Sequence, residues 1–310
     1  PEYRRQRQMC IRDRHNSLMS GILLGLLGGG FIGVSDCVAR FTAQRTSLSV
    51  LILFVMGISS VLMTVWFLAS GDWPRWDFYS WSVSLLSGFL NLAALLFLYK
   101  ALARGPVSVA SPAASTFSVI LVALNAVSGE PFSWQQLVSV FVVFIGIAML
   151  ARPGSGTTIH ENYSPAWLRT TALLGLGTGA CVALRFFFAQ EAVVFLGPIH
   201  SLYLNRLAAL VSVLLLMFWE QSRNKPRNWP QGSVLKLVIF QSFLEMLALG
   251  AFLYGSTGDG RVGASIGFSA FSAVTTLSAW IWLKEKVDPH RIIWIGIIIA
   301  AIWIAILYAP

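Results

Sequence analysis

The chain has 310 residues, of which 56% are hydrophobic and only 11% carry a charge, and its mean hydropathy is +0.71. An average soluble domain has about 25% charged residues, so this composition excludes a soluble globular protein and indicates an integral membrane protein. The net charge of +9 does not indicate nucleic-acid binding, because the basic residues lie in an N-terminal tail and in short connections between apolar runs.

The first 18 residues differ from everything that follows. They begin with Pro1 and include the basic segment "YRRQRQMCIRDR", whereas the apolar sequence starts at Met19. We expect residues 1–18 to be a non-native extension, with the natural start near Met19 and a basic cytosolic arm as the alternative. None of the three cysteines has the C-x-x-C spacing of a metal or redox pair, so no metal, cofactor or disulfide is predicted.

Ten apolar segments are long enough to cross a bilayer, which takes about 20 residues. They lack the alternation of a membrane barrel, so we predict an all-α integral membrane fold with ten transmembrane helices. The connections are short, and tryptophans gather near the segment ends, as in an interfacial belt. The segments are 19–39, 47–69, 79–103, 106–127, 134–151, 167–190, 197–219, 233–255, 260–283 and 290–309.

The chain contains two copies of a five-helix unit. "LYKALARGPVSVASPAASTF" (98–117) aligns with "LYGSTGDGRVGASIGFSAFS" (253–272) at an offset of 155, and "LLGLLGG" (23–29) aligns with "LLGLGTG" (173–179) at an offset of 150. Because five is odd, the second copy enters the bilayer from the opposite side, and such inverted repeats are typical of secondary transporters. The expected organisation is repeat 1 over 19–151, a linker over 152–166 and repeat 2 over 167–310.

A glycine-rich run, "GILLGLLGGGFIGVSD", contains the pattern G-x-G-x-x-G, but it lies inside an apolar segment and follows no strand, which argues against a dinucleotide-binding turn. Instead, Gly25 and Gly29 belong to a stripe of glycines spaced four residues apart, and Gly175 and Gly179 repeat the stripe in the second copy. Such stripes let membrane helices approach closely. Two matching stripes point to a binding site between the copies, with static packing as the alternative.

Among the ionisable residues within predicted helices, four stand out, and the cost of a charge there makes each a functional candidate. Asp36 and Arg185 lie in the first helix of each copy, whereas Arg206 and Glu245 lie in the second and third helices of the second copy. Glu245 either pairs with Arg206 across helices or serves as a proton or substrate site. Arg206 has the planar fork that binds a carboxylate or phosphate. Asp36 is also placed to pair with Arg40 on its own helix.

Other polar and helix-weakening positions follow the repeat. Tyr99 and Tyr254 match across the two copies, and we expect both to be interfacial anchors. Pro112 and Gly267, near the start of the fourth helix of each copy, are expected to weaken that helix at equivalent places. The uncharged residues that complete the predicted binding and coupling set are Asn91, Ser118, Asn125 and Thr275.

These features resemble the EamA-type members of the drug/metabolite transporter superfamily. The resemblance rests on "LYKALARGPVSVASPAASTFSVILVALNAVSGE" (98–130) and "LYGSTGDGRVGASIGFSAFSAVTTLSAWIWLKE" (253–285), because the family has a proline in the fourth helix and Gly-Glu at its end. Pro112 and Glu130 match this pattern, whereas Gly267 departs from it. The resemblance implies transport, commonly export, through a central cavity between helices 1, 3, 4, 6, 8 and 9, with helices 5 and 10 as scaffold.

We predict a multi-pass secondary transporter of the plasma (inner) membrane that exports a small metabolite, such as an amino acid or related organic solute, by alternating access. Its expected partners are the solute, the lipid bilayer and, as a candidate coupling ion, protons; a homodimer and the side that the termini face stay open. A lipid-modifying membrane enzyme is one alternative, but "GASIG" (263–267) fits G-x-S-x-G inside an apolar segment, not at a strand-to-helix turn. A non-transporting membrane scaffold is the other.

Overall fold

The computed structural model describes the backbone of residues 2–105, 107–129, 133–150 and 164–283 and of a few residues between 292 and 304, and the side chains of most of these residues from 19 onward. This part of the chain contains helices and no strand. The helices are α1 (Glu2–Arg45), α2 (Leu48–Ser70), α3 (Phe78–Arg104), α4 (Val107–Ala114), α5 (Phe117–Val127), α6 (Trp134–Leu150), α7 (Pro165–Leu196), α8 (Pro198–Ser222), α9 (Gly232–Gly255), the short 3-10 helix η1 (Gly258–Gly260), α10 (Arg261–Phe268) and α11 (Phe271–Leu283).

Seven helical segments in the described chain are long and apolar enough to cross a membrane. They are α1 from Met19 onward, α2, α3, α7, α8, α9 and the run Gly258–Trp282, and each overlaps a predicted segment. The helix α6 has 17 residues, and the predicted segment 290–309 lies mostly outside the described residues, as does most of the predicted linker 152–166. The all-helical membrane fold is therefore confirmed, whereas the number of ten helices stays a prediction.

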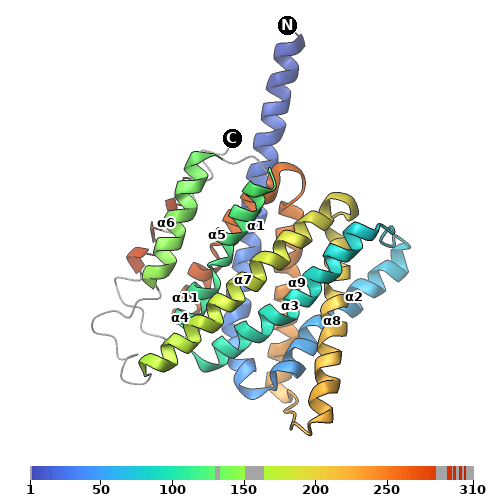
Figure 1. The fold of residues 1–310 in the computed structure, drawn as a ribbon, viewed down its shortest axis with the longest axis vertical. Helices are drawn as coiled ribbons and strands as arrows, with labels where there is room; N and C mark the ends of the chain where they lie inside the picture. Colours follow the sequence, from blue (N-terminus) through green and yellow to red (C-terminus); the bar gives the residue numbers. More distant parts are fainter. Residues whose placement is uncertain are drawn as a thin grey trace.

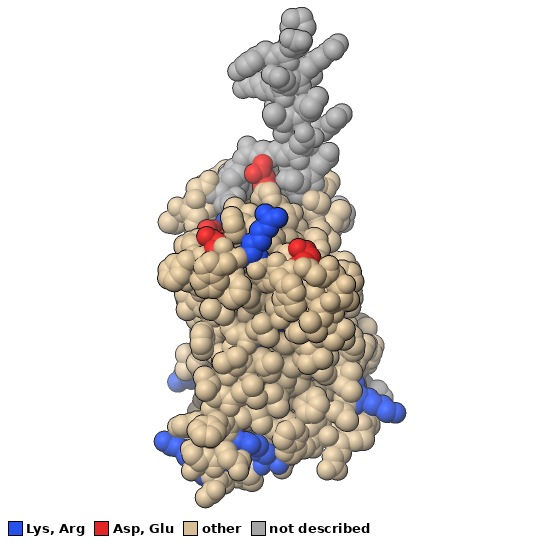
Figure 2. Space-filling view, turned by 90° about the vertical axis from the view of Figure 1, so that its right-hand side faces the viewer, with Lys and Arg blue, Asp and Glu red and all other residues tan. Residues whose placement is uncertain are grey.

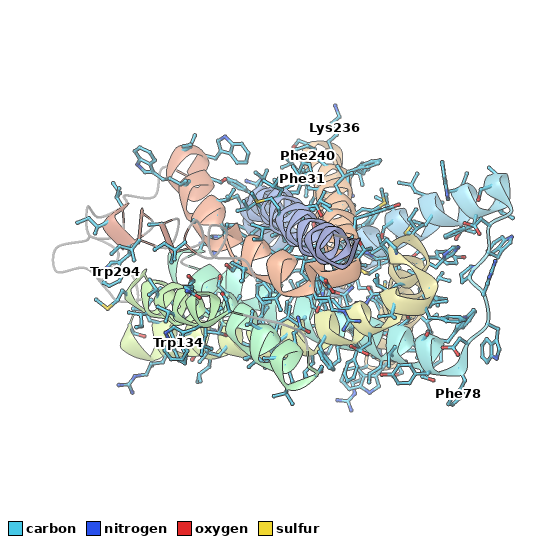
Figure 3. All side chains as sticks on the ribbon, turned by 90° about the horizontal axis from the view of Figure 1, so that it is seen from above. Phe31, Phe78, Trp134, Lys236, Phe240 and Trp294 are labelled. Carbon is cyan, nitrogen blue, oxygen red and sulfur yellow. The ribbon has the colours of Figure 1, made fainter. Side chains whose placement is uncertain are left out.

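The outer surface of the bundle is apolar. The side chains of Phe78, Trp134 and Phe240 are 76%, 72% and 48% exposed and project outward from the bundle (Figure 3). On the face in Figure 2, Lys, Arg, Asp and Glu lie toward the two ends, and a broad band without them separates the ends. A contiguous apolar band of this kind suits the hydrocarbon of a bilayer, where a charge is costly.

The two copies have matching contacts between helices. The helix α3 packs along α7 just as its counterpart α9 packs along α1, and α1 contacts α10 and α11 just as α7 contacts α4 and α5. Figure 1 shows α1 running downward from the N-terminus, whereas α7, the first helix of the second copy, runs upward. Corresponding helices therefore have opposite directions, as an inverted repeat requires.

The fourth membrane segment of each copy is broken near its middle. Residues 115–116 separate α4 from α5, and residues 269–270 separate α10 from α11. Pro112 and Gly267, the expected break points, are themselves helical, and the side chain of Pro112 lies outside the described residues. The break in the second copy follows Gly267, because its carbonyl accepts a three-residue turn bond from the Ala270 N–H at 3.2 Å.

The glycine stripes pack against these broken helices. A Cβ added at Gly29 would lie 2.9 Å from a carbonyl oxygen of α10, and one added at Gly175 would lie 2.9 Å from a carbonyl oxygen of α4. A Cβ at Gly25 would lie 2.4 Å from the backbone of α10, one at Gly179 3.0 Å from the backbone of α4, and one at Gly267 2.2 Å from the backbone of α1. The close helix approach predicted from the spacing is therefore present in both copies.

Local caps fix where the helices begin and end. The Asp77 carboxylate accepts a hydrogen bond from the Ser80 N–H at 2.8 Å and begins α3. Hydrogen bonds from the side chain and, to a smaller extent, the main chain of Ser80 hold the pKa of Asp77 below its usual value. Gly105 follows α3 with a φ of 62°, a left-handed conformation that suits glycine. The chain therefore turns sharply into α4, which brings the end of α3 close to α1.

Candidate functional site

A cavity lies at the centre of the bundle, between α1, α3, α4, α5, α7, α9, α10 and α11. These elements correspond to predicted segments 1, 3, 4, 6, 8 and 9, where the resemblance implies a cavity. The volume of the cavity is about 50 Å³, which is smaller than the ~300–1,000 Å³ that is usual for small-molecule sites, so the cavity has to widen before it can hold an organic solute. Both copies line the cavity, so any relative movement of the copies changes its shape.

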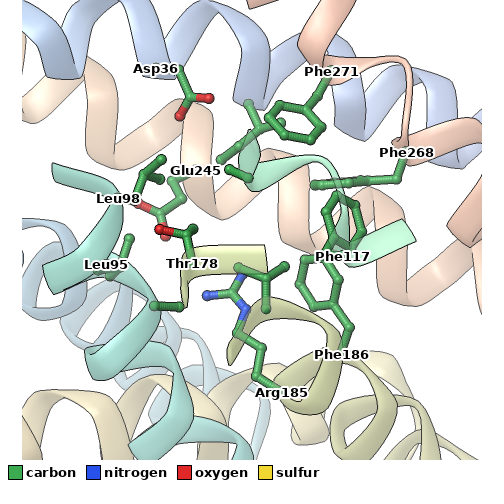
Figure 4. A pocket seen from close by; sticks show the side chains of 14 residues that line it. Asp36, Leu95, Leu98, Phe117, Thr178, Arg185, Phe186, Glu245, Phe268 and Phe271 are labelled. Atoms are coloured by element: carbon green, nitrogen blue, oxygen red, sulfur yellow. The ribbon is translucent and has the colours of Figure 1, made fainter. Parts of the chain in front are cut away.

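Three charged side chains point into this space (Figure 4). Asp36 of α1 and Glu245 of α9 supply carboxylates, and Arg185 of α7 supplies a guanidinium group. Each of the three residues is at most 6% exposed. The Thr275 hydroxyl lies 3.5 Å from Asp36 Oδ2. The cavity therefore presents charges of both signs to whatever enters it.

Arg206 binds Glu245 from the side away from the cavity. Its Nη1 lies 3.2 Å from Glu245 Oε1, and its Nη2 donates to the main-chain carbonyl of Glu245 at 3.3 Å. The Arg206 side chain is fully buried and is not part of the cavity lining. From the sequence, Glu245 is expected either to pair with Arg206 or to serve as a proton or substrate site. The pair with Arg206 is present, and the same carboxylate also faces the cavity. Arg206 is therefore placed to orient Glu245, not to contact a solute.

The sequence missed most of the network around Glu245. Tyr99 Oη donates to Glu245 Oε2 at 3.3 Å, Gln241 Nε2 donates to Tyr99 Oη at 2.9 Å, and Thr42 Oγ1 donates to Gln241 Oε1 at 2.8 Å. The expected interfacial position is wrong for Tyr99, which is 2% exposed, but it fits Tyr254, which is 48% exposed. Gln241 stands four residues before Glu245, a spacing that places both on one helix face and is the signal that was available.

A second network positions Arg185. The guanidinium Nη1 donates to Asn91 Oδ1, and Asn91 Nδ2 lies 3.4 Å from Asn205 Oδ1. Asn205 Nδ2 donates to Ser87 Oγ at 2.6 Å, and Ser87 Oγ donates to the Arg185 main-chain carbonyl at 2.7 Å. These bonds close a ring through α3, α7 and α8. Asn91 therefore lies beside Arg185 and is not itself part of the cavity lining.

Aromatic rings form one wall of the cavity. Phe117, Phe186, Phe268 and Phe271 line one side of it, and the two carboxylates lie on the other (Figure 4). The ring centroids of Phe186 and Phe268 are 5.3 Å apart, and those of Phe117 and Phe271 are 5.7 Å apart. The rings come from both copies. An apolar group placed among them would lose its contact with water and pack against their faces.

Two further predicted site residues lie away from this cavity or outside the described side chains. Asn125 Nδ2 donates to Gln190 Oε1 at 3.1 Å, in a polar cluster that is separate from the cavity lining. Ser118 lies in α5, but its side chain is outside the described residues. Thr178, which no pattern singled out, lines the cavity one helical turn after the predicted Gly175 stripe position.

The expected pair between Asp36 and Arg40 does not form. Arg40 Nη1 donates instead to the main-chain carbonyls of Leu102 and Ala103, at 2.5 Å and 2.9 Å. These carbonyls are at the C-terminal end of α3, where a helix leaves its last carbonyl groups unpaired and attracts cations. Arg40 therefore binds the end of α3 and not Asp36, the neighbour on its own helix.

Comparison with known proteins gives the family. The model of the EamA-like transporter family matches residues 19–152 and 169–307, which correspond to the two copies. The chain belongs to the EamA-like transporter family. Members of this EamA-like family are membrane transporters, so the repeat architecture and the membrane location follow for this chain. The family match therefore agrees with the resemblance seen in the sequence.

Solved structures share the fold of this EamA-like chain. One of 28 matching chains, described as "Crystal structure of protein", has a TM-score of 0.69 and 15% sequence identity, and the match covers 95% of this chain and 97% of that one. At this identity the likeness shows the fold alone. A search among curated proteins finds no match.

The described side chains contain no group of three or more His, Cys, Asp or Glu placed to hold a metal ion. Ser265, the serine of the G-x-S-x-G match, lies within α10 and donates its hydroxyl to the Arg261 main-chain carbonyl at 2.8 Å. It therefore has the hydrogen bond of an ordinary helical serine and not the exposed setting of a nucleophile.

Proposed function

We propose that this EamA-like chain is a secondary transporter that exports a small organic solute, an amino acid or a related compound, across the plasma (inner) membrane by alternating access. The observation that supports this proposal is one cavity between two inverted copies, lined by Asp36, Arg185 and Glu245 and by a wall of phenylalanine rings. A cavity at the interface of inverted repeats is where secondary transporters bind their solutes.

The charges in the cavity favour a zwitterion with an apolar side chain. Arg185 is the group that faces a solute carboxylate, and Asp36 and Glu245 are the groups that face a solute ammonium. A zwitterion satisfies both signs of charge without adding a net charge to a low-dielectric site, so its transfer from water costs less than that of an ion. The phenylalanine wall then takes the apolar side chain.

Protons are the proposed coupling ion. The carboxylates of Asp36 and Glu245 differ in their partners, and therefore in how readily each can take up a proton. Glu245 is held by the guanidinium of Arg206, whereas the partner that the described residues give Asp36 is the neutral hydroxyl of Thr275. A buried carboxylate without a cationic partner exchanges its charge for a proton at less cost than one in an ion pair. We therefore assign proton exchange to Asp36 and a fixed charge to Glu245.

Reconstituted vesicles test this proposal. The full chain is placed in proteoliposomes, and the uptake of each of the common amino acids, labelled one at a time, is measured with and without a pH gradient. We expect saturable uptake of at least one amino acid above empty liposomes, stimulated by the gradient. Asp36→Asn should lose the stimulation by the gradient, whereas Asp72→Asn, whose side chain is 76% exposed outside the cavity, should leave both uptake and its stimulation unchanged. Uptake of no amino acid above empty liposomes contradicts the proposal.

A further inference from the structure

Arg40 and Gln190 occupy equivalent positions in the two copies, at the offset of 150. Arg40 stands four residues after Asp36, and Gln190 stands four residues after Phe186, and both Asp36 and Phe186 line the cavity. Four residues advance a helix by about 6 Å. Each of the two residues therefore lies about one turn beyond the cavity, and, because α1 and α7 run in opposite directions, toward opposite ends of the molecule (Figure 1).

Arg40 binds the C-terminal end of α3, which we name the first corner (residues 101–105). Its guanidinium donates to the carbonyls of Leu102 and Ala103 and lies against Gly105, where an added Cβ would come within 2.5 Å of it. From the other copy, the Thr171 hydroxyl of α7 donates to the Gly105 carbonyl at 3.3 Å. The first corner is therefore held between α1 of its own copy and α7 of the other.

Gln190 binds the turn that joins α9 to α10, which we name the second corner (residues 256–262). Its Nε2 donates to Ser256 Oγ at 3.0 Å and lies 3.4 Å from the Arg261 carbonyl oxygen. Arg261 in turn pairs with Glu191 at 2.6 Å and donates to the Gln190 carbonyl at 3.1 Å. The second corner is therefore tied to α7 by an amide and an ion pair.

The contacts at the two corners are related by the repeat. Gly260 is the counterpart of Gly105, and Gly21 is the counterpart of Thr171. A Cβ added at Gly21 would lie 2.6 Å from the Gly260 carbonyl oxygen, so α1 touches the second corner just as α7 touches the first. The first corner thus contacts Arg40 of α1 and Thr171 of α7, and the second corner contacts Gln190 of α7 and Gly21 of α1.

We propose that the two corners are the gates of the transport path, and that Arg40 and Gln190 are the positioning residues that hold them closed. Both sets of bonds are present in this structure, so it has the closed arrangement at both ends. Release of Arg40 separates α1 from the end of α3 and opens the end that carries Arg45 and Arg104; release of Gln190 opens the opposite end. The inference rests on the proposed transport function and adds the residues that govern access.

Sided labelling of a cavity cysteine tests the gates. The reporter is Thr178→Cys, a cavity residue that is 1% exposed, in a chain with Cys10, Cys37 and Cys181 replaced by Ala. A membrane-impermeant maleimide is applied to right-side-out and inside-out vesicles, and a Lys236→Cys chain identifies the vesicles that expose the Arg40 end. We expect slow labelling from both sides, a rise of about tenfold from the Arg40 end alone in Arg40→Ala, and a similar rise from the other end alone in Gln190→Ala.

Matched controls and a milder variant make each outcome decisive. Arg45→Ala and Arg75→Ala remove arginines near the two ends and should leave the labelling rates unchanged. Should Arg40→Ala fail to accumulate, Thr171→Val, which removes one hydroxyl contact to the same corner, should raise labelling from the Arg40 end. Equal rises from both ends, or no rise with either corner variant, overturn the gates. Labelling needs no solute, so the gates and the transport function can fail separately.

Discussion

At the residue scale, the buried pair of Arg206 and Glu245 is the most consequential contact in the described chain. The two side chains are 0% and 3% exposed and 3.2 Å apart. Arg206→Met leaves a buried carboxylate without its cation and should lower the free energy of unfolding by about 3–5 kcal/mol. The double variant Arg206→Met with Glu245→Gln leaves no buried charge and should recover most of that loss. Unfolding in detergent measures both, and a single variant no less stable than the double one contradicts this account.

The hydroxyl of Tyr99 gives a second prediction at this scale. Tyr99→Phe keeps the buried ring but removes the bond to Glu245 and the acceptor of Gln241. A hydrogen bond to a charged group contributes about 1.5–3 kcal/mol, so kcat/KM for solute flux should fall about tenfold or more if the bond orients Glu245 during transport. The exposed counterpart variant, Tyr254→Phe, should leave flux unchanged. Equal effects of the two variants would show that the Tyr99 hydroxyl has no special role.

What the sequence could and could not predict at this scale has a physical cause. Asp36, Arg185 and Glu245, which line the cavity, could be singled out as candidates because an ionisable group in an apolar helix is costly and therefore conspicuous. Tyr99 and Asn205 were missed because a neutral polar side chain in such a helix is common, and only the packing of neighbouring helices decides whether it faces a site. The pair of Asp36 with Arg40 was wrong because the carbonyls at the end of α3 are invisible to spacing within one helix.

At the scale of the elements, glycine spacing predicted close helix contact correctly, whereas the break points were displaced. Gly25 and Gly175 face the backbones of α10 and α4, because a four-residue period places small residues on one face wherever that face points. The breaks instead fall at residues 115–116 and 269–270, where three-residue turns form. A break in a membrane helix leaves backbone N–H and C=O groups without their helical partners, and neighbouring helices have to satisfy them. The sequence around Pro112 or Gly267 does not show where those neighbouring helices lie.

The glycine stripe yields a prediction with a matched control in the same helix. A Cβ at Gly25 would overlap the backbone of α10, whereas nothing lies within 4 Å of a Cβ at Gly30. Gly25→Ala should therefore lower the free energy of unfolding by about 1–3 kcal/mol through overpacking. Gly30→Ala should be neutral or raise it by up to about 1 kcal/mol, because alanine favours a helix over glycine. Thermal unfolding of both variants in one detergent compares them, and equal midpoints would rule out stripe packing at Gly25.

At the scale of the whole molecule, composition and the internal repeat were enough to predict the architecture. The offsets of 150 and 155 align α1 with α7 and α3 with α9, and these helices make matching contacts and run in opposite directions. The repeat also predicted an interface between the copies, because an odd number of helices in each copy forces inversion, whereas the helices around the central cavity were implied by the family resemblance. It did not locate the corners, since Arg40 and Gln190 share a position but not a residue type.

Transport by this chain requires that the cavity lined by Asp36, Arg185 and Glu245 is the site through which a solute passes. Counterflow in proteoliposomes tests it most directly, with the amino acid that shows the highest uptake used as the label and no ion gradient imposed. We predict saturable exchange for the unmodified chain and for Asp72→Asn, and a loss of about 10- to 100-fold in Arg185→Gln, which removes the cation that faces the solute. Exchange in Arg185→Gln at the rate of the unmodified chain would contradict the claim.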